Sequence, residues 1–241
     1  MFQNLRKSKK LLLIAMTCAT FAIAGCGSDT TKTTADNGTS VTWSETFDGT
    51  KTDFTVKSAP THAVSMSQAT TEMMLQLGLE DKMAGTAFKE EEIYPPLQAA
   101  YDKVKVLSEK WPSYEVFMSV KPDFATGWPD SFSKRAIPAD KMISQKVNIW
   151  IPESMLSTKA DLETNFSDMI KLGEIFGVKP KAEEWVAGQR KTLAAIQNKL
   201  KDLPRKRVFI YDSEDGQPFT AFEGYTTNIL KLIGADNVMS G

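Results

Sequence analysis

Short apolar runs alternate with stretches of helical spacing from residue 60 onward. The runs predict strands at 62–66, 83–88, 104–107, 124–128 and 147–151. Helices are predicted between them at 71–77, 114–120 and 139–145, and 67–70 is predicted to be a polar loop with capping residues. Strands that alternate with short helices favour a parallel sheet covered on both faces. In such a sheet the loops at the carboxyl ends of the strands are where ligands bind.

After Pro152 the spacing becomes mainly helical. It predicts one helix at 162–176 and a long one from Pro180 to about Leu203, which at 1.5 Å per residue is about 30 Å long. A strand at 207–211, a turn at 215–216, a strand at 219–222 and a helix at 227–233 follow. The predicted fold class is therefore α/β, with two α/β lobes joined by one long rigid helix that acts as a strut.

The N-terminal residues are predicted to be a leader and not part of the fold. Four basic residues between Arg6 and Lys10 precede an apolar run at 11–25, which is too short to span a bilayer. The run ends in Ile23-Ala24-Gly25-Cys26, which resembles a bacterial lipobox, so we expect diacylglycerol on Cys26 and an anchor on the extracytoplasmic face of the cell membrane. A plain signal peptide or a buried N-terminal helix is the alternative. Residues 27–40 are predicted to be a polar tether, and 41–56 a hairpin turning at Asp48-Gly49.

Composition and charge exclude several classes of function. The 241 residues carry a net charge of −1, and loss of the leader leaves 25 Lys and Arg against 30 Asp and Glu, a net charge of −5. Nucleic acid is thus a poor partner. One histidine and two cysteines argue against a multi-histidine metal site and a disulfide scaffold. No nucleophile elbow or zincin motif occurs, and the acidic run at 212–216 is predicted to be a solvated turn, so we predict neither an enzyme nor a metal site.

Several separate motifs resemble the ABC-importer binding proteins for ferric siderophores, haem and vitamin B12, the class with a helical backbone. They are the segment 64–72 followed by Leu77-Gly78-Leu79, Tyr114-Glu115 before 120–123, the start of the long helix at 181–183, and the segment 232–238. Gln68 departs from the family's usual proline. The resemblance implies that the ligand is held between two lobes that open and close little on binding. It also implies that the protein is a monomer without a cofactor and that its partner is a permease.

The resemblance also suggests roles for individual residues. Glu115 corresponds to a glutamate that docks on permease arginines, although an ordinary first-turn glutamate is the alternative. Trp128 aligns with a cleft-lining aromatic of vitamin B12-binding relatives, with a core residue as the alternative. Weaker ligand-binding candidates are Phe88 and Trp111, for which simple packing is the alternative, and Phe222. The loop cations Lys134 and Arg135 are further candidates, with a solvated loop charge as the alternative. Trp150 and Trp185 are predicted to be core.

The expected ligand is an iron–siderophore-type chelate, with cobalamin or haem as alternatives. A surface lipoprotein that binds a ligand or partner without transport is the competing function. The predicted regions are a leader, a lipidated tether with the hairpin, an N-terminal lobe, connecting helices and part of a C-terminal lobe, at 1–25, 26–57, 58–155, 156–204 and 205–241. A lobe of 37 residues is below the size of about 40 that folds unaided. We therefore expect an incomplete C-terminal lobe that exposes apolar surface and binds ligand weakly.

Overall fold

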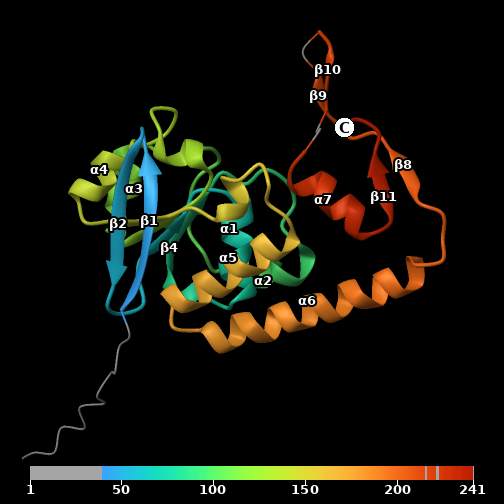
Figure 1. The fold of residues 1–241 in the computed structure, drawn as a ribbon. Coiled ribbons are helices and arrows are strands. Elements are labelled where there is room, and N and C mark those ends of the chain that lie inside the picture. The colour runs from blue at the N-terminus through green and yellow to red at the C-terminus, as the bar shows by residue number, and fades with distance from the viewer. Residues whose placement is uncertain (1–39, 215, 221–222, 241) are drawn as a thin grey trace, which may run out of the picture. The chain divides into compact units, whose positions relative to one another are not determined.

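A computed structural model describes residues 40–214, 216–220 and 223–240 (Figure 1). The predicted leader, Cys26 and most of the predicted tether lie outside these residues, and so does Phe222. The predictions made for them stay predictions.

The first described element is the predicted hairpin. Strands β1 (Val41–Phe47) and β2 (Thr50–Val56) pair in antiparallel register, with Trp43 opposite Phe54. The two turn residues, Asp48 and Gly49, have φ of 47° and 79°, as the favoured two-residue hairpin turn requires. The indole N–H of Trp43 donates to the carbonyl of Ile149 at 2.7 Å. This bond and the burial of Phe54 hold the hairpin against the main sheet.

The main sheet has five parallel strands in the spatial order β5-β4-β3-β6-β7. Their bounds in chain order are β3 (Ala63–Ser65), β4 (Met83–Ala87), β5 (Val106–Ser108), β6 (Phe124–Thr126) and β7 (Asn148–Trp150). The chain runs outward from β3 to β5, returns to the other side of β3, and continues outward to β7. The direction of winding therefore reverses between β3 and β6, and this position is the switch point of the sheet.

Short α-helices and 3-10 helices connect these strands, and the last 3-10 helix follows β7. The α-helices are α1 (Gln68–Gln76), α2 (Gln98–Tyr101), α3 (Tyr114–Ser119) and α4 (Ala139–Ser144). The 3-10 helices are η1 (Glu80–Lys82), η2 (Pro95–Leu97), η3 (Pro129–Phe132) and η4 (Glu153–Met155).

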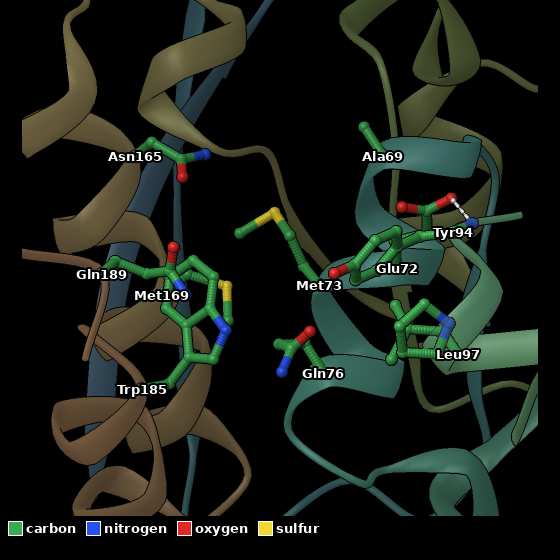
Figure 2. Close-up of a pocket in the computed structure, with 11 residues that line it drawn as sticks. Ala69, Glu72, Met73, Gln76, Tyr94, Leu97, Asn165, Met169, Trp185 and Gln189 are labelled. Atoms are coloured by element: carbon green, nitrogen blue, oxygen red, sulfur yellow. Dashed lines mark hydrogen bonds between the residues drawn. The ribbon is translucent and has the colours of Figure 1, made fainter. Parts of the chain in front are cut away.

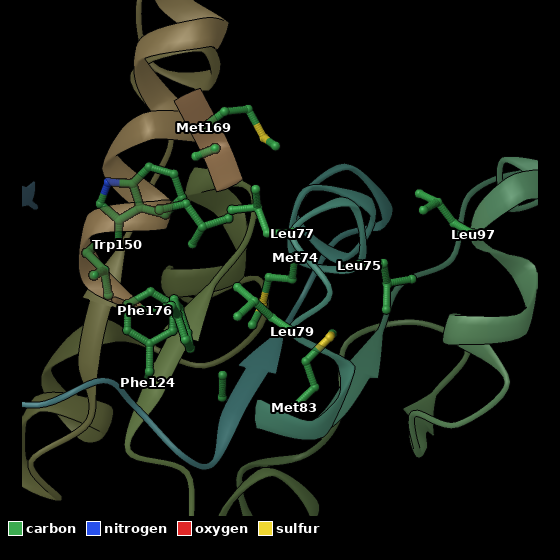
Figure 3. Packing of buried hydrophobic residues seen from close by; sticks show 14 of the residues in the cluster. Met74, Leu75, Leu77, Leu79, Met83, Leu97, Phe124, Trp150, Met169 and Phe176 are labelled. Atoms are coloured by element: carbon green, nitrogen blue, oxygen red, sulfur yellow. The ribbon is translucent and has the colours of Figure 1, made fainter. Parts of the chain in front are cut away.

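Both faces of the sheet are buried, as the alternating pattern predicts. Ala63, Phe124 and Trp150 belong to one apolar cluster, and their neighbours Val64 and Ala125 belong to the other. Successive residues of a strand point to opposite faces, so each strand contributes to both clusters. In the first cluster Phe124 packs edge-on against Phe176 with ring centroids 5.1 Å apart, and Trp150 lies beside them (Figure 3). The prediction that Trp150 is a core residue is confirmed, since it is 4% exposed.

Helix α1 begins three residues earlier than predicted. Ser67 is its N-cap, and the Ser67 side chain accepts a hydrogen bond from the backbone N–H of Thr70. The hydroxyl of Thr71 contacts those of Ser65 and Thr86 at 2.8 and 2.6 Å. These side chains are buried and satisfy one another, so the polar segment forms a helix start at the carboxyl edge of the sheet and not a loop.

Two long helices follow the sheet. Helix α5 (Leu162–Ile175) starts with a capping box formed by Asp161 and Thr164, and α6 (Lys179–Leu200) has 22 residues and ends three residues before the predicted position. A Cβ atom on Gly173 would lie 2.6 Å from the Cβ of Ala182. The two helices therefore approach closely at their joined ends because Gly173 has no side chain.

The elements after α6 form two small sheets and a helix. The strand predicted at 207–211 is divided: β8 (Lys206–Val208) pairs in parallel with β11 (Ala235–Asn237), whereas β9 (Tyr211–Glu214) forms a hairpin with β10 (Pro218–Thr220). Asp212 and Glu214 thus lie in a hairpin strand, so the solvated turn predicted for 212–216 is wrong for 212–214, although these residues are exposed as predicted. Helix α7 (Tyr225–Leu232) starts two residues earlier than predicted. Its Asn228 donates to the carbonyl of Ala160 at 2.9 Å. Phe209, Tyr211 and Phe219 are each about half exposed.

Candidate functional site

A pocket of about 440 Å³ lies at the carboxyl edge of the main sheet. It is formed by the segments that follow β4, β5 and β6, the strands on both sides of the switch point. Its lining residues are Phe88, Glu90, Trp111, Trp128, Pro129 and Asp130. Three of the ligand-binding residues predicted from the sequence, Phe88, Trp111 and Trp128, are therefore brought together in one pocket.

The rings of Phe88 and Trp111 form a stacked pair. Their centroids are 4.6 Å apart and their planes are inclined by 17°. The indole N–H of Trp111 donates to the carbonyl of Met66, directly after β3, at 3.0 Å, and this bond fixes the orientation of the ring. The stack thus presents a flat apolar surface whose position depends on the central strand.

Phe88 has an unusual backbone conformation. Its φ is 60°, in the left-handed region that side chains other than glycine rarely adopt. The other non-glycine residues with positive φ in the described chain are Asp48 in the hairpin turn and Lys121 and Lys146, which follow helix ends. Phe88 lies neither in a hairpin turn nor after a helix end, since it directly follows β4. Such conformations concentrate at binding sites, where the surrounding packing compensates for their cost.

Trp128 completes the aromatic lining from the other side of the switch point. Strand β6 ends at Thr126, two residues earlier than predicted, and Trp128 precedes the 3-10 helix η3. A Cβ atom on Gly127 would lie only 2.8 Å from the hydroxyl oxygen of Ser131 and 3.1 Å from the Cβ of Met66. The chain can therefore pass close to the end of β3 only with glycine at this position. The indole N–H of Trp128 donates weakly to the Glu90 carboxylate at 3.4 Å.

Charged residues surround the aromatic rings. Arg135 does not line the pocket, and its guanidinium pairs with the carboxylate of Asp130 at 2.6 Å. Lys134 is exposed, in agreement with the solvated-loop alternative. A neighbouring pocket of about 460 Å³ is lined by Phe88, Lys89, Glu90, Glu109 and Lys110. Nothing in the sequence pattern distinguishes these charged neighbours from other surface charges, although each lies within two residues of Phe88 or Trp111.

Glu115 lies in the first turn of α3 and is fully accessible. Its pKa is lowered, first by a hydrogen bond from its own backbone N–H and next by the hydroxyl of Ser113, the N-cap residue. The nearby ammonium group of Lys141 lowers it further. The side chain is therefore a stable surface anion at physiological pH.

Two buried carboxylates hold the segment that follows β7. Glu45 of β1 accepts from the backbone N–H of Ile151 at 3.0 Å, and Asp168 of α5 accepts from those of Glu153 and Ser154, both at 2.9 Å. Burial raises the pKa of Glu45 to about 7, the Ile151 bond opposes this shift, and the negative charges of Glu153 and Asp168 add to it. Burial also raises the pKa of Asp168. These groups fix the exit of the chain from the sheet and do not line the aromatic pocket.

A larger pocket, of about 650 Å³, lies between α1 and η2 on one side and α5 and α6 on the other (Figure 2). Trp185 and Met169 face Met73 and Gln76 across it, with Glu72 and Tyr94 at the same wall as Met73 (Figure 2). The Glu72 carboxylate accepts from the backbone N–H of Tyr94 at 3.2 Å. Trp185 is only partly buried and packs edge-on against Phe166, so the prediction that it is a core residue holds for one side of its ring only. No strand end contributes to this pocket, which separates it from the site at the switch point.

An aromatic pocket at the switch point of a parallel sheet is the kind of site at which α/β proteins bind small ligands. The chain belongs to the periplasmic binding protein family, whose model matches residues 64–240. Its class is that of the ABC-transporter substrate-binding proteins, which bind a ligand for transport and are not enzymes.

Individual relatives agree with this assignment. The chain is 27% identical, over 96% of its length and 73% of the relative, to an uncharacterized ABC transporter substrate-binding lipoprotein, YvrC, of Bacillus subtilis. It is 25% identical to a vitamin B12-binding protein of Vibrio vulnificus over 74% of this chain and 61% of that protein. The crystal structure of a periplasmic binding protein from Veillonella parvula superimposes with a TM-score of 0.84 at 98% identity, covering 85% of this chain and 69% of that one.

The described helices include none with both the length and the apolar character needed to cross a bilayer.

Proposed function

We propose that this protein captures a metal chelate at the aromatic pocket of the switch point and delivers it to the permease of an ABC importer. The carrying observation is the convergence of Phe88, Trp111 and Trp128 in one pocket at the carboxyl edge of the sheet. Flat aromatic rings bind large planar or aromatic ligands over a wide contact area. The sequence prediction of an iron–siderophore-type chelate is the first candidate.

Cobalamin or haem is the second candidate. The planes of Phe88 and Trp111 are nearly parallel, which suits a flat macrocycle better than a compact ferric complex. One relative, from Vibrio vulnificus, is a vitamin B12-binding protein, and this supports the same candidate.

The proposed cellular setting rests on two predicted roles, the lipid anchor at Cys26 and permease docking by Glu115. A diacylglycerol on Cys26 would hold the protein on the outer face of the cell membrane, within reach of the permease. Glu115 would dock on permease arginines, because an exposed carboxylate with a lowered pKa keeps its charge and suits a guanidinium fork. Permease domains that pull the two proposed lobes apart would release the ligand.

A fluorescence titration tests the proposal. Three of the five tryptophans of the chain lie outside the pocket, and two line it, so a bound chelate quenches part of the emission. We expect saturable quenching by at least one of a ferric hydroxamate, a ferric catecholate, haem and cyanocobalamin, and loss of that phase in Trp128→Ala. Absence of quenching by all four would overturn the proposed ligand class. Tight binding without association with the permease would favour a surface lipoprotein that does not transport.

A further inference from the structure

A second pocket adjoins the aromatic pocket, and most of its lining side chains are charged. The two pockets, of about 440 and 460 Å³, share the side chains of Phe88 and Glu90 as a common wall. On one side of this wall lie Trp111 and Trp128, and on the other lie Lys89 and Lys110. A ligand larger than either pocket can therefore occupy both by passing over Phe88.

The two pockets differ in whether their charged side chains form ion pairs within the protein. In the aromatic pocket, Asp130 is paired with Arg135, so its charge is neutralised within the protein. In the neighbouring pocket, neither Lys89 nor Lys110 forms an ion pair within 4.0 Å with any carboxylate of the described chain, although Glu90 and Glu109 line the same pocket. Both lysines are exposed. Within the described residues Glu90 and Glu109 form no ion pair either, so the pocket holds two ammonium groups and two carboxylates without a salt bridge between them. The two ammonium groups, on flexible stems, are available to an anion of the ligand.

We propose that the site binds two chemically different ends of its chelate. The flat, metal-bearing part stacks on Phe88 and Trp111 beside Trp128, and an anionic arm, a phosphate or a carboxylate, binds Lys89 and Lys110. This inference rests on the proposed function and narrows its ligand class to planar metal chelates that carry an anionic arm.

The order of residues in the two loops supports this arrangement. Lys89 follows Phe88, and Lys110 precedes Trp111, so each partner of the aromatic stack carries a cation next to it in sequence. Both lysines line the same pocket. Two cations from separate loops thus line one pocket, where both can donate hydrogen bonds to the oxygen atoms of one phosphate or carboxylate group.

A pair of corrinoids tests the anionic arm. Cyanocobalamin carries a phosphate in its nucleotide arm, and dicyanocobinamide lacks that arm. We expect the double variant Lys89→Gln/Lys110→Gln to lower the affinity for cyanocobalamin about tenfold, as the loss of charge-assisted hydrogen bonds does, and to leave the affinity for dicyanocobinamide within twofold of wild type. The matched control is Lys105→Gln/Lys191→Gln, which removes two exposed lysines outside both pockets and should change neither affinity. Equal effects of the Lys89/Lys110 variant on the two corrinoids, or no effect on either, would overturn the inference.

Smaller probes keep the test independent of the proposed function. 1-Naphthyl phosphate and 1-naphthol share one aromatic ring system and differ in the phosphate, and calorimetry measures both. If no chelate binds, the proposed function fails, whereas a preference for the phosphate that disappears in Lys89→Gln/Lys110→Gln still supports the two-ended site. If chelates bind and the phosphate gives no advantage in either series, the proposed function stands and the two-ended site is refuted.

Discussion

Phe88 and Trp111 stack with their centroids 4.6 Å apart, although they follow different strands, β4 and β5, and are separated by 23 positions in the sequence. The left-handed backbone of Phe88 turns its ring toward Trp111, and the bond from Trp111 to Met66 fixes the second ring. The binding surface is thus formed before any ligand arrives. A preformed surface loses little conformational entropy on binding, which favours affinity.

The first prediction concerns this stack. Phe88→Ala should lower the affinity for the bound chelate about tenfold, because it removes an aromatic contact and leaves Trp111 without its partner. Tryptophan quenching titrations measure the change. Phe219→Ala, which removes a more exposed phenylalanine ring from β10, outside the pocket, is the control and should bind as wild type does. Equal losses in the two variants would show that the effect is not local to the stack.

The second prediction concerns docking. Glu115→Lys should abolish stimulation of the permease ATPase by the protein and leave chelate affinity unchanged, because a reversed charge repels arginine. Asp140→Lys reverses the charge of another exposed first-turn carboxylate, on α4, and serves as the matched control. ATPase assays with the reconstituted importer report the outcome. Normal stimulation by the Glu115 variant would refute the docking role.

The third prediction concerns the contact between α5 and α6. Gly173→Ala should lower the free energy of unfolding by about 1–3 kcal/mol, because its new Cβ atom would lie 2.6 Å from that of Ala182. Ala182→Gly alone should cost about 1 kcal/mol through helix propensity. In the double variant the contact with the Ala182 Cβ is absent and only the looser one with the Lys179 backbone, at 3.2 Å, remains. Urea unfolding should therefore show a smaller loss than the sum of the two single changes. Strict additivity would contradict this account of the close approach.

The fourth prediction concerns pH. Because burial raises the folded-state pKa of Glu45 from 4.5 to about 7, the folded protein holds this proton more tightly than the unfolded chain does. The corresponding stability is complete below pH 4.5 and is lost as the pH rises through 7, by about 3 kcal/mol in all. Glu45→Gln keeps an acceptor for the Ile151 N–H without the charge. Urea unfolding should therefore find wild type and variant similar at pH 4.5, and the variant more stable by about that amount at pH 8. Parallel pH profiles of the two proteins would refute the assignment.

Local signals in the sequence were sufficient for most individual elements. Asp48-Gly49 predicts the hairpin, and a polar residue before an apolar helical stretch predicts α3 and α5 within one residue at their ends. These local signals gave a wrong prediction where buried polar side chains form hydrogen bonds with one another. Ser67 to Thr71 have the composition of a loop, but their hydroxyls form a buried network that begins α1. Likewise, the apolar run at 207–211 does not reveal that its two ends pair with different strands.

The sequence by itself determined the α/β character of the chain, its resemblance to a transport family, and the residue types that can form an aromatic site. Spacing and capping are properties of neighbouring residues, so they can be read without a fold. Only the tertiary structure decided that Phe88, Trp111 and Trp128 share one pocket and that Lys89 and Lys110 share its neighbour. The strand order and the left-handed turn at Phe88 bring these loops together, and both depend on contacts between residues far apart in the chain.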